Sequence, residues 1–166
     1  MKYIVCSDIH RDENAFERIL EAQKELGCDR ILCAGDFCPT ANMEYMAGDM
    51  LCVEGNCDRW GNRWTILPDP KPYADFRDFG RRIVITHGDR YWSDSFSLAP
   101  GDIFISGHTH VPVLEKGEDG IIYFNPGSPS RPRGREGKTI GTLENGLIRL
   151  LSFPDLFVLE ELSFEL

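Results

Sequence analysis

Five short apolar runs, each four or five residues long, are spread over the first two thirds of the chain. They cover residues 3–6, 30–34, 50–53, 82–86 and 102–106. Apolar residues in these runs follow one another almost without interruption, which is typical of strands that are covered on both faces. The pattern therefore predicts five buried strands, with other elements packed against both faces of their sheet.

A helix is expected between the first two of these strands. The apolar residues that recur there at helical spacing are Ala15, Ile19, Ala22 and Leu26. Either Asp12 or Asn14 can serve as the N-cap, and Gly27 ends the pattern. Residues 41–47 predict a second, shorter helix, and three prolines within residues 68–72 indicate a loop. The chain therefore begins with a strand, a helix and a second strand.

After residue 110 the pattern changes to that of a β-meander. Strands are expected over residues 121–124, 138–143, 147–153 and 156–162. The pair Asn145-Gly146 between two of them is a hairpin signal because both residues tolerate a positive φ. The whole pattern predicts an α/β fold in a single domain, residues 1–166, with two packed mixed β-sheets and helices outside.

The composition fits one folded domain and narrows the range of partners. The chain has 166 residues, 42% of them hydrophobic, which suffices for one core. No apolar run approaches the roughly 20 residues of a membrane span, and the first residues turn polar too early for a signal peptide. We therefore expect a cytoplasmic protein without a membrane partner. The formal charge of −9 argues against a nucleic-acid polymer, and an anionic substrate would need local positive charge.

The cysteines do not form a recognisable framework. All six lie within the first 57 residues, and no two of them form a Cys-x-x-Cys pair. We interpret them as reduced thiols of the core or of loops. A zinc site or a disulfide stays open as an alternative for Cys33 and Cys38 alone.

Each of the five apolar runs is followed by a residue that can bind a metal ion. The segments that follow them are Ser7-Asp8-Ile9-His10, Gly35-Asp36, Gly55-Asn56-Cys57-Asp58, His87-Gly88-Asp89 and Gly107-His108-Thr109-His110. Ligands of open α/β sheets bind beyond the carboxyl ends of the strands, so these segments can place their side chains at one point. Capping or turn formation would explain one aspartate alone, but all four histidines of the chain also lie in these segments. The sequence therefore predicts a metal site.

Together the segments offer two carboxylates, one amide and four imidazoles. The predicted ligands are Asp8, His10, Asp36, Asn56, His87, His108 and His110. Seven groups are too many for one tetrahedral ion and suit two ions that share a bridging carboxylate. Two divalent ions outweigh two carboxylates in charge, which supplies the positive potential that a phosphate needs. Oxygen and nitrogen ligands suit Mn²⁺, which we expect first, and also Fe, Ni, Co or Zn.

In order and spacing, the five segments resemble the motifs of the calcineurin-like metallophosphoesterases, and most closely those of the small, single-domain YfcE-type phosphodiesterase branch. The resemblance runs from residue 4 to about residue 130. It implies a four-layer sandwich of two sheets flanked by helices. The ligand sets that it implies are Asp8, His10 and His110 for one metal and Asn56, His87 and His108 for the other, with Asp36 bridging both.

The resemblance also implies an activity, the hydrolysis of a small phosphoester, and of a diester first, by a hydroxide that bridges the two metals. Asn56 and His108 are expected to orient the phosphoryl group as well. Many members have a His where this chain has Cys57, so the donor of the leaving-group proton is open. Asp58 and Asp89 are candidates, beside solvent or a metal-bound water.

Arg131 belongs to a basic cluster at residues 131–138 and is the candidate for a contact with the non-reacting end of the substrate. Most of that cluster fits a solvated loop equally well.

Two other functions are compatible with the same fold. One is a catalytically silent scaffold that binds partner proteins, similar to the retromer subunit. Such a scaffold would lack metal-binding side chains at some of the ligand positions. A metal-binding regulatory protein would bind the ions without hydrolysis. Because all seven ligand positions carry competent side chains, the sequence favours the enzyme.

Overall fold

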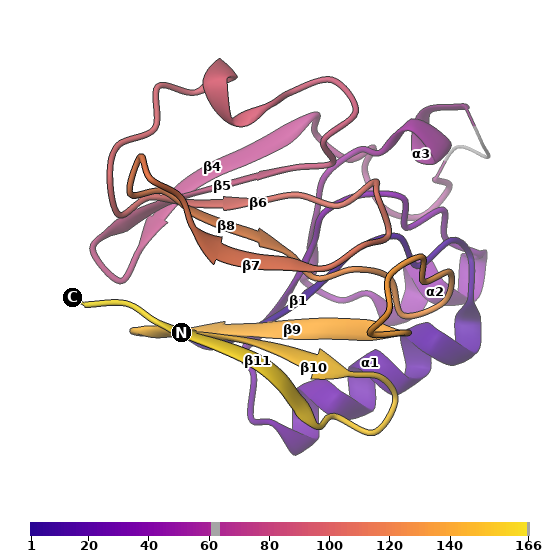
Figure 1. Ribbon diagram of the computed structural model, residues 1–166. Coiled ribbons are helices and arrows are strands. Elements are labelled where there is room, and N and C mark those ends of the chain that lie inside the picture. Colours follow the sequence, from indigo (N-terminus) through magenta and orange to yellow (C-terminus); the bar gives the residue numbers. More distant parts are fainter. Residues whose placement is uncertain (61–63, 166) are drawn as a thin grey trace.

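Two mixed β-sheets pack face to face in the computed structural model, which describes residues 1–60 and 64–165 (Figure 1). One sheet has the strand order β11 (Val158–Ser163), β10 (Leu147–Ser152), β9 (Thr139–Glu144), β1 (Tyr3–Cys6), β2 (Arg30–Cys33) and β3 (Leu51–Cys52). The other has the order β4 (Tyr73–Asp78), β5 (Arg81–Thr86), β6 (Ile103–Ile105), β8 (Ile122–Asn125) and β7 (Val113–Lys116). The predicted fold class, two packed mixed sheets with helices, is confirmed.

Alternation along each strand sends its side chains into two different cores. On β1, Val5 points between the sheets, where it joins a core that includes Ile85 and Phe124. The next residue, Cys6, belongs to the opposite core, with Phe16 of helix α1 (Glu13–Glu25). The near-continuous apolar runs of the sequence therefore arise because both faces of these strands are covered.

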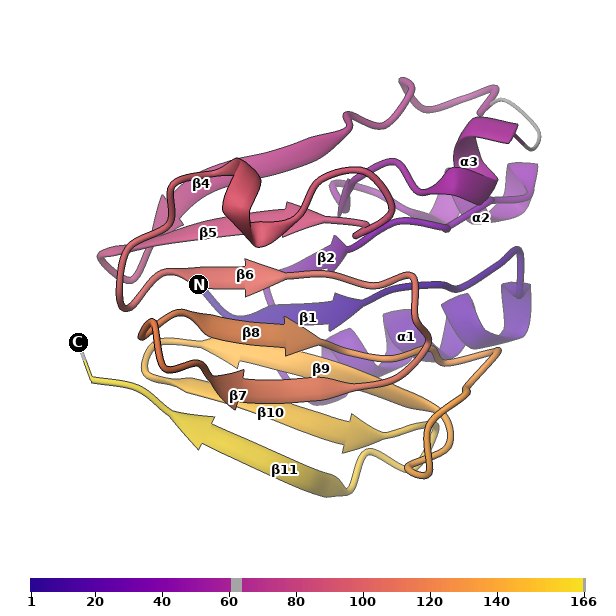
Figure 2. The ribbon, with the colours of Figure 1, turned by 45° about the horizontal axis from the view of Figure 1, so that its top comes forward.

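Helices cover the outer face of the six-stranded sheet. There α1 and α2 (Ala41–Met46) lie against it, and the short α3 (Asn56–Trp60) lies near its carboxyl-end edge (Figure 2). The outer face of the other sheet carries Val84 and Phe104, which pack with Phe96 and Leu98. Those two residues belong to the irregular segment that contains the 3₁₀ turn η1 (Ser93–Ser95). Among the described helices, none has the length and apolar character that crossing a membrane requires.

The sequence missed two strands and misplaced a third. Strand β4 was missed because its apolar residues alternate with charged ones at the edge of a sheet, and β7 because Leu114 is its one buried residue. The prediction that β8 belongs to a meander with the last three strands is wrong. It pairs parallel with β6 and antiparallel with β7, and the chain then crosses to the other sheet before β9. The hairpin at Asn145-Gly146 joins β9 and β10, as predicted.

The N-cap of α1 is Asp12, whose carboxylate accepts a hydrogen bond from the backbone N–H of Ala15 at 2.9 Å. Replacing Asp12 by Ala is expected to cost about 1 kcal/mol, because one helical N–H loses its partner. In a chain of this length that corresponds to a melting temperature lower by roughly 2 to 4 °C. Asn14→Ala, within the helix, is the matched control. Equal losses in both variants would contradict the assignment of the cap.

Candidate metal centre

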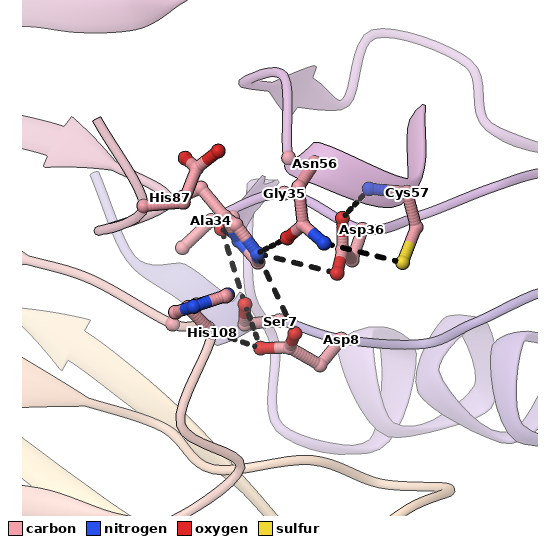
Figure 3. A network of polar contacts seen from close by, with 12 residues as sticks. Ser7, Asp8, Ala34, Gly35, Asp36, Asn56, Cys57, His87 and His108 are labelled. Atoms are coloured by element: carbon pink, nitrogen blue, oxygen red, sulfur yellow. Dashed lines mark hydrogen bonds and ion pairs between the residues drawn. The ribbon is translucent and has the colours of Figure 1, made fainter. Parts of the chain in front are cut away.

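The predicted ligands follow the carboxyl ends of strands from both sheets, and Figure 3 shows five of them together, Asp8, Asp36, Asn56, His87 and His108. Asp8 follows β1 and Asp36 follows β2, both in the six-stranded sheet. His87 comes directly after β5, and His110 comes after β6, both in the other sheet. Side chains from Asp8, His10 and His110 form one group that could hold an ion, and those from Asp8, Asp36 and His87 form another. Both sheets therefore contribute ligands to each group.

Asp8 lies at the centre of these groups and is fully buried. Its Oδ2 accepts hydrogen bonds from the Ser7 hydroxyl at 2.6 Å and from the backbone N–H of His108 at 2.9 Å. Its Oδ1 is buried without a hydrogen-bond partner among the described residues, 3.2 Å from Nε2 of His110 and 3.6 Å from Nε2 of His10. A buried carboxylate oxygen without a donor is costly unless a cation is its partner, so this residue fits a metal ligand.

Asp36 faces the same space from the next strand. Its Oδ1 accepts a hydrogen bond from the backbone N–H of Cys57 at 2.8 Å. Its Oδ2 lies 3.2 Å from Nε2 of His87 and 3.6 Å from Nε2 of His10. Asp36 thus reaches imidazoles of both groups, although Asp8 is the residue that the two groups share.

Two imidazoles are oriented by backbone carbonyls outside the site. Nδ1 of His87 lies 2.7 Å from the carbonyl oxygen of Ala34, and Nδ1 of His110 lies 2.6 Å from that of Arg131. A neutral ring that donates its Nδ1–H to a carbonyl keeps a lone pair on Nε2, as metal-binding histidines usually do. These lone pairs face other acceptors, since Nε2 of His87 lies 3.1 Å from Oδ1 of Asn56. Converging acceptors of this kind fit a cation between them.

His108 occupies a different position from the other histidines. Its side chain is exposed, and its ring packs edge-on against that of His87 with 5.0 Å between centroids. The groups with metal-binding geometry do not include its ring. His108 therefore contributes a backbone N–H to Asp8 and places an imidazole at the mouth of the site.

The backbone of this site departs from common conformations. Five of the seven predicted ligands have φ between 50° and 72°, namely Asp8, His10, Asp36, His108 and His110. Such values are uncommon outside glycine and concentrate at functional sites, where the surrounding structure maintains them. A Cβ added at Gly107 would collide with the side chains of Ser7 and Asp8, so the chain can approach Asp8 only through a glycine here.

The charges of the site are coupled. Burial alone would raise the pKa of Asp8, but the neighbouring His10 and His110 hold it well below its ordinary value. Burial would likewise lower the pKa of His87, but its contact with Asp36 and the charge of Asp8 raise that pKa to about 9. In metal-free protein, His87 therefore carries a proton that a metal ion would have to displace.

Metal-free protein is expected to lose stability as the pH rises from about 6.5 to about 9. The proton on His87 stabilises the folded state, and this contribution is complete at pH values below the pKa of His87 in the unfolded chain. It is lost as the pH rises through the pKa of His87 in the folded protein. Melting temperatures across this range would show the decline, and His87→Gln should remove it. Saturation with a divalent ion should also remove the decline in stability, because His87 is neutral when it binds the ion. A decline of equal slope in His87→Gln would show that His87 does not cause it.

Asp58 holds the backbone of the site and does not face it. Its Oδ2 accepts hydrogen bonds from the N–H groups of Asp36 at 2.8 Å and Gly55 at 2.9 Å, and its Oδ1 accepts one from Cys38 at 2.8 Å. Burial raises the pKa of Asp58 to about 6. With its carboxylate turned to these N–H groups, the predicted role as proton donor has no support in its contacts. The sequence missed the positioning role, for which an aspartate in the first turn of α3 was the available signal.

The other two candidate residues lie outside the cluster. Asp89 forms an ion pair with Arg59 at 2.6 Å, and Arg59 also contacts Glu54 at 3.2 Å. Its carboxylate is therefore occupied by a guanidinium. The Arg131 side chain is exposed, while its backbone carbonyl orients His110.

The cysteines group differently from the alternative that the sequence left open. Cys33 is fully buried in a core that also contains Cys6 and against which Cys52 packs. Cys38 instead lies with Cys57, with ligand atoms within 4.8 Å. A zinc site or a disulfide that joins Cys33 to Cys38 is therefore wrong, because both thiols are free and they belong to separate groups.

Comparisons with known proteins agree with this fold. The family model of the calcineurin-like phosphoesterase superfamily domain matches residues 1–145. The phosphodiesterase YfcE of Escherichia coli is 29% identical over 182 aligned positions, which cover 98% of each chain. A Methanothermobacter thermautotrophicus protein named "Probable metallophosphoesterase" is 32% identical over 142 positions, covering 78% of this chain and 77% of that one.

Solved structures show the same similarity. The E. coli YfcE phosphoesterase superposes with a TM-score of 0.86 at 26% identity, covering 99% of this chain and 100% of that one. A zinc complex of Vps29 from Entamoeba histolytica has a TM-score of 0.70 at 19% identity, with coverage of 99% and 100%, a likeness of fold alone. The family resemblance seen in the sequence motifs is thus confirmed. This chain belongs to the calcineurin-like phosphoesterase superfamily.

Proposed function

We propose that this protein hydrolyses small phosphoesters, diesters in preference to monoesters, with two divalent metal ions, Mn²⁺ first among them. The observation that carries the proposal is the buried Oδ1 of Asp8, which faces imidazoles and has no hydrogen-bond donor among the described residues. The similarity to a phosphodiesterase over 98% of the chain supports the reaction class. The net charge of −9 supports a small substrate over a nucleic-acid polymer.

The proposed ligands are the seven residues of the sequence prediction. Asp8, His10 and His110 would hold one ion and Asn56, His87 and His108 the other, with Asp36 facing both. Two such ions lower the pKa of water and neutralise the oxygens of a phosphoryl group in transfer. His108 would have to turn its exposed ring inward to ligate, or it would remain at the mouth and donate a hydrogen bond to a phosphoryl oxygen.

The leaving group would depart without a protein acid. Asp58 accepts three backbone hydrogen bonds, and Asp89 is paired with Arg59, so neither carboxylate is free to donate a proton. Solvent or a metal-bound water is then the remaining source of the proton, which favours substrates whose leaving groups need no protonation. Aryl phosphodiesters satisfy this requirement.

The test begins with metal-free protein. We expect Mn²⁺ to restore hydrolysis of a bis-aryl phosphodiester more than that of the corresponding aryl monoester, and His108→Ala to reduce the diesterase rate by about 100-fold, as for a lost transition-state donor. Metal content measured on the same samples separates the alternatives. Stoichiometric metal without hydrolysis of either ester would contradict the proposal and favour a scaffold or a regulatory protein.

Arg131 is proposed to contact the non-reacting end of the substrate. Its side chain is exposed, so Arg131→Ala should leave the fold intact and keep the backbone carbonyl that orients His110. We expect KM for the diester to rise by about tenfold, the value of one charge-assisted hydrogen bond, with kcat nearly unchanged. Steady-state kinetics would measure both, with Arg135→Ala as the matched control. Unchanged KM would remove Arg131 from the site.

A further inference from the structure

A third group with metal-binding geometry lies beside the proposed centre and differs from it in chemistry. It consists of His10, Cys38 and Cys57, whose ligand atoms all lie within 4.8 Å of one another. Both thiols are free and half-buried. The mechanism proposed above uses neither sulfur. Hard ions such as Mn²⁺ prefer oxygen ligands, whereas a pair of thiols with one imidazole suits a softer ion.

The backbone of each cysteine is held by a carboxylate, one from the proposed centre and one that supports it. The backbone N–H of Cys38 donates to Asp58 at 2.8 Å, and that of Cys57 donates to Asp36 at 2.8 Å. Figure 3 shows Cys57 beside Asp36, with its sulfur linked to the Asn56 amide at 3.6 Å. Cys38 also has a φ of 46°, a conformation that a non-glycine residue adopts rarely. Three separate segments of the chain thus bring the ligands together.

The spacing is close to that of a known coordination geometry. With zinc–sulfur bonds of about 2.3 Å and a tetrahedral angle, two sulfurs lie about 3.8 Å apart, and a sulfur and a nitrogen about 3.5 Å apart. From the present upper limit of 4.8 Å, the two sulfurs must approach each other by at most about 1.0 Å, and each sulfur must approach the imidazole nitrogen by at most about 1.3 Å. Rotation of the cysteine side chains about χ1 can supply this movement.

We infer that Cys38, Cys57 and His10 form a binding site for a thiophilic divalent ion of the Zn²⁺ and Cd²⁺ class. Binding breaks two S–H bonds, forms two metal–sulfur bonds and releases two protons to solvent. Water or a carboxylate oxygen completes the coordination. The inference goes beyond the proposed function because it requires no hydrolysis.

The site shares His10 with the proposed centre. Nε2 of His10 faces Nε2 of His110 at 3.2 Å and the two aspartates at 3.6 Å. One imidazole nitrogen cannot bind two ions, so a thiophilic ion that bound the cysteines and this nitrogen would compete with Mn²⁺ for His10. The protein would then respond to soft metals by losing one hard ion.

Cadmium is the probe, because Cd²⁺–thiolate bonds absorb in the ultraviolet and report thiolate ligation directly. Reduced, metal-free protein titrated with Cd²⁺ under anaerobic conditions should develop this absorption with one equivalent of ion. Cys38→Ser and Cys57→Ser should each lower the absorption at saturation by about half, and the double variant should abolish it. Cys28→Ser is the matched control, since that thiol lies outside the group, and it should titrate like the unmodified protein.

His10→Ala should keep the absorption and weaken Cd²⁺ binding by at least tenfold, because the two thiols remain and the imidazole is lost. Thermal melts identify any variant that fails to fold, and ¹¹³Cd chemical shifts on the unmodified protein then provide a second measure of sulfur ligation. An absorption that persists in the double variant, or a cadmium shift typical of oxygen ligands alone, would overturn the inference. Absence of phosphodiesterase activity would leave both readouts unchanged, so the two proposals fail separately.

Discussion

Asp36→Asn is expected to lower the Mn²⁺-stimulated hydrolysis of an aryl phosphodiester by more than about 100-fold. Loss of a residue that merely supports a metal ligand typically costs 10- to 100-fold, and Asp36 is proposed as a ligand that serves both ions. The asparagine retains an oxygen that can accept the hydrogen bond from Cys57, so the fold should survive. Kinetics and metal analysis on the same preparation would measure the loss of rate and the loss of bound ion together.

Asp69→Asn is the matched control, because it removes the same charge from an exposed loop residue. It should leave both the rate and the metal content unchanged. Full activity of Asp36→Asn, or full loss of activity with both ions still bound tightly, would contradict a role for Asp36 as shared ligand.

Asp58→Ala is expected to give the largest loss of stability among these variants. Three N–H groups, two of them buried and one partly buried, would lose their acceptor at about 1 kcal/mol each, so the free energy of unfolding should fall by about 3 kcal/mol. For a chain of this length the melting temperature would fall by roughly 6 to 12 °C. Calorimetry of metal-free protein measures this directly and separates it from any change in metal affinity.

Asp58→Asn distinguishes positioning from proton donation. The amide oxygen can still accept from two of the N–H groups, so this variant should lie between Asp58→Ala and the unmodified protein in stability. If Asp58 were a general acid, Asp58→Asn and Asp58→Ala would be equally inactive, and both would keep the stability of the unmodified protein. Asp69→Ala controls for the loss of an exposed carboxylate. A stable but inactive Asp58→Asn would return this residue to the list of proton donors.

Much of the fold could be predicted because the strands of its centre are buried on both faces. Strands such as β1 and β5 therefore appear as continuous apolar runs. Edge strands do not carry this signal, and β4 was missed for that reason. The sheet to which β8 belongs could not be predicted either, because the hydrophobic periodicity of a strand does not indicate which strand it pairs with.

The candidate site could likewise be predicted only in part. Five of the seven predicted ligands come together in groups that could hold an ion, because each follows a strand and topology brings strand ends together. The roles of Asp58 and Asp89 could not be predicted, because the direction of a side chain depends on contacts that are not visible in the spacing of residues along the sequence. Asp58 accepts from a backbone N–H of Cys38, 20 residues away, and Asp89 pairs with Arg59. Likewise, the proximity of Cys38 and Cys57 emerges only in the folded chain.

The contribution of both sheets to the two ligand groups that share Asp8 makes ion binding there a property of the assembled sandwich. Asp8 comes from one sheet and His110 from the other, so neither layer alone presents a complete set. An ion coordinated by both would act as a cross-link between the layers. Its affinity would then appear only after they dock, and the free energy of binding would add to the cohesion of the entire β-sandwich.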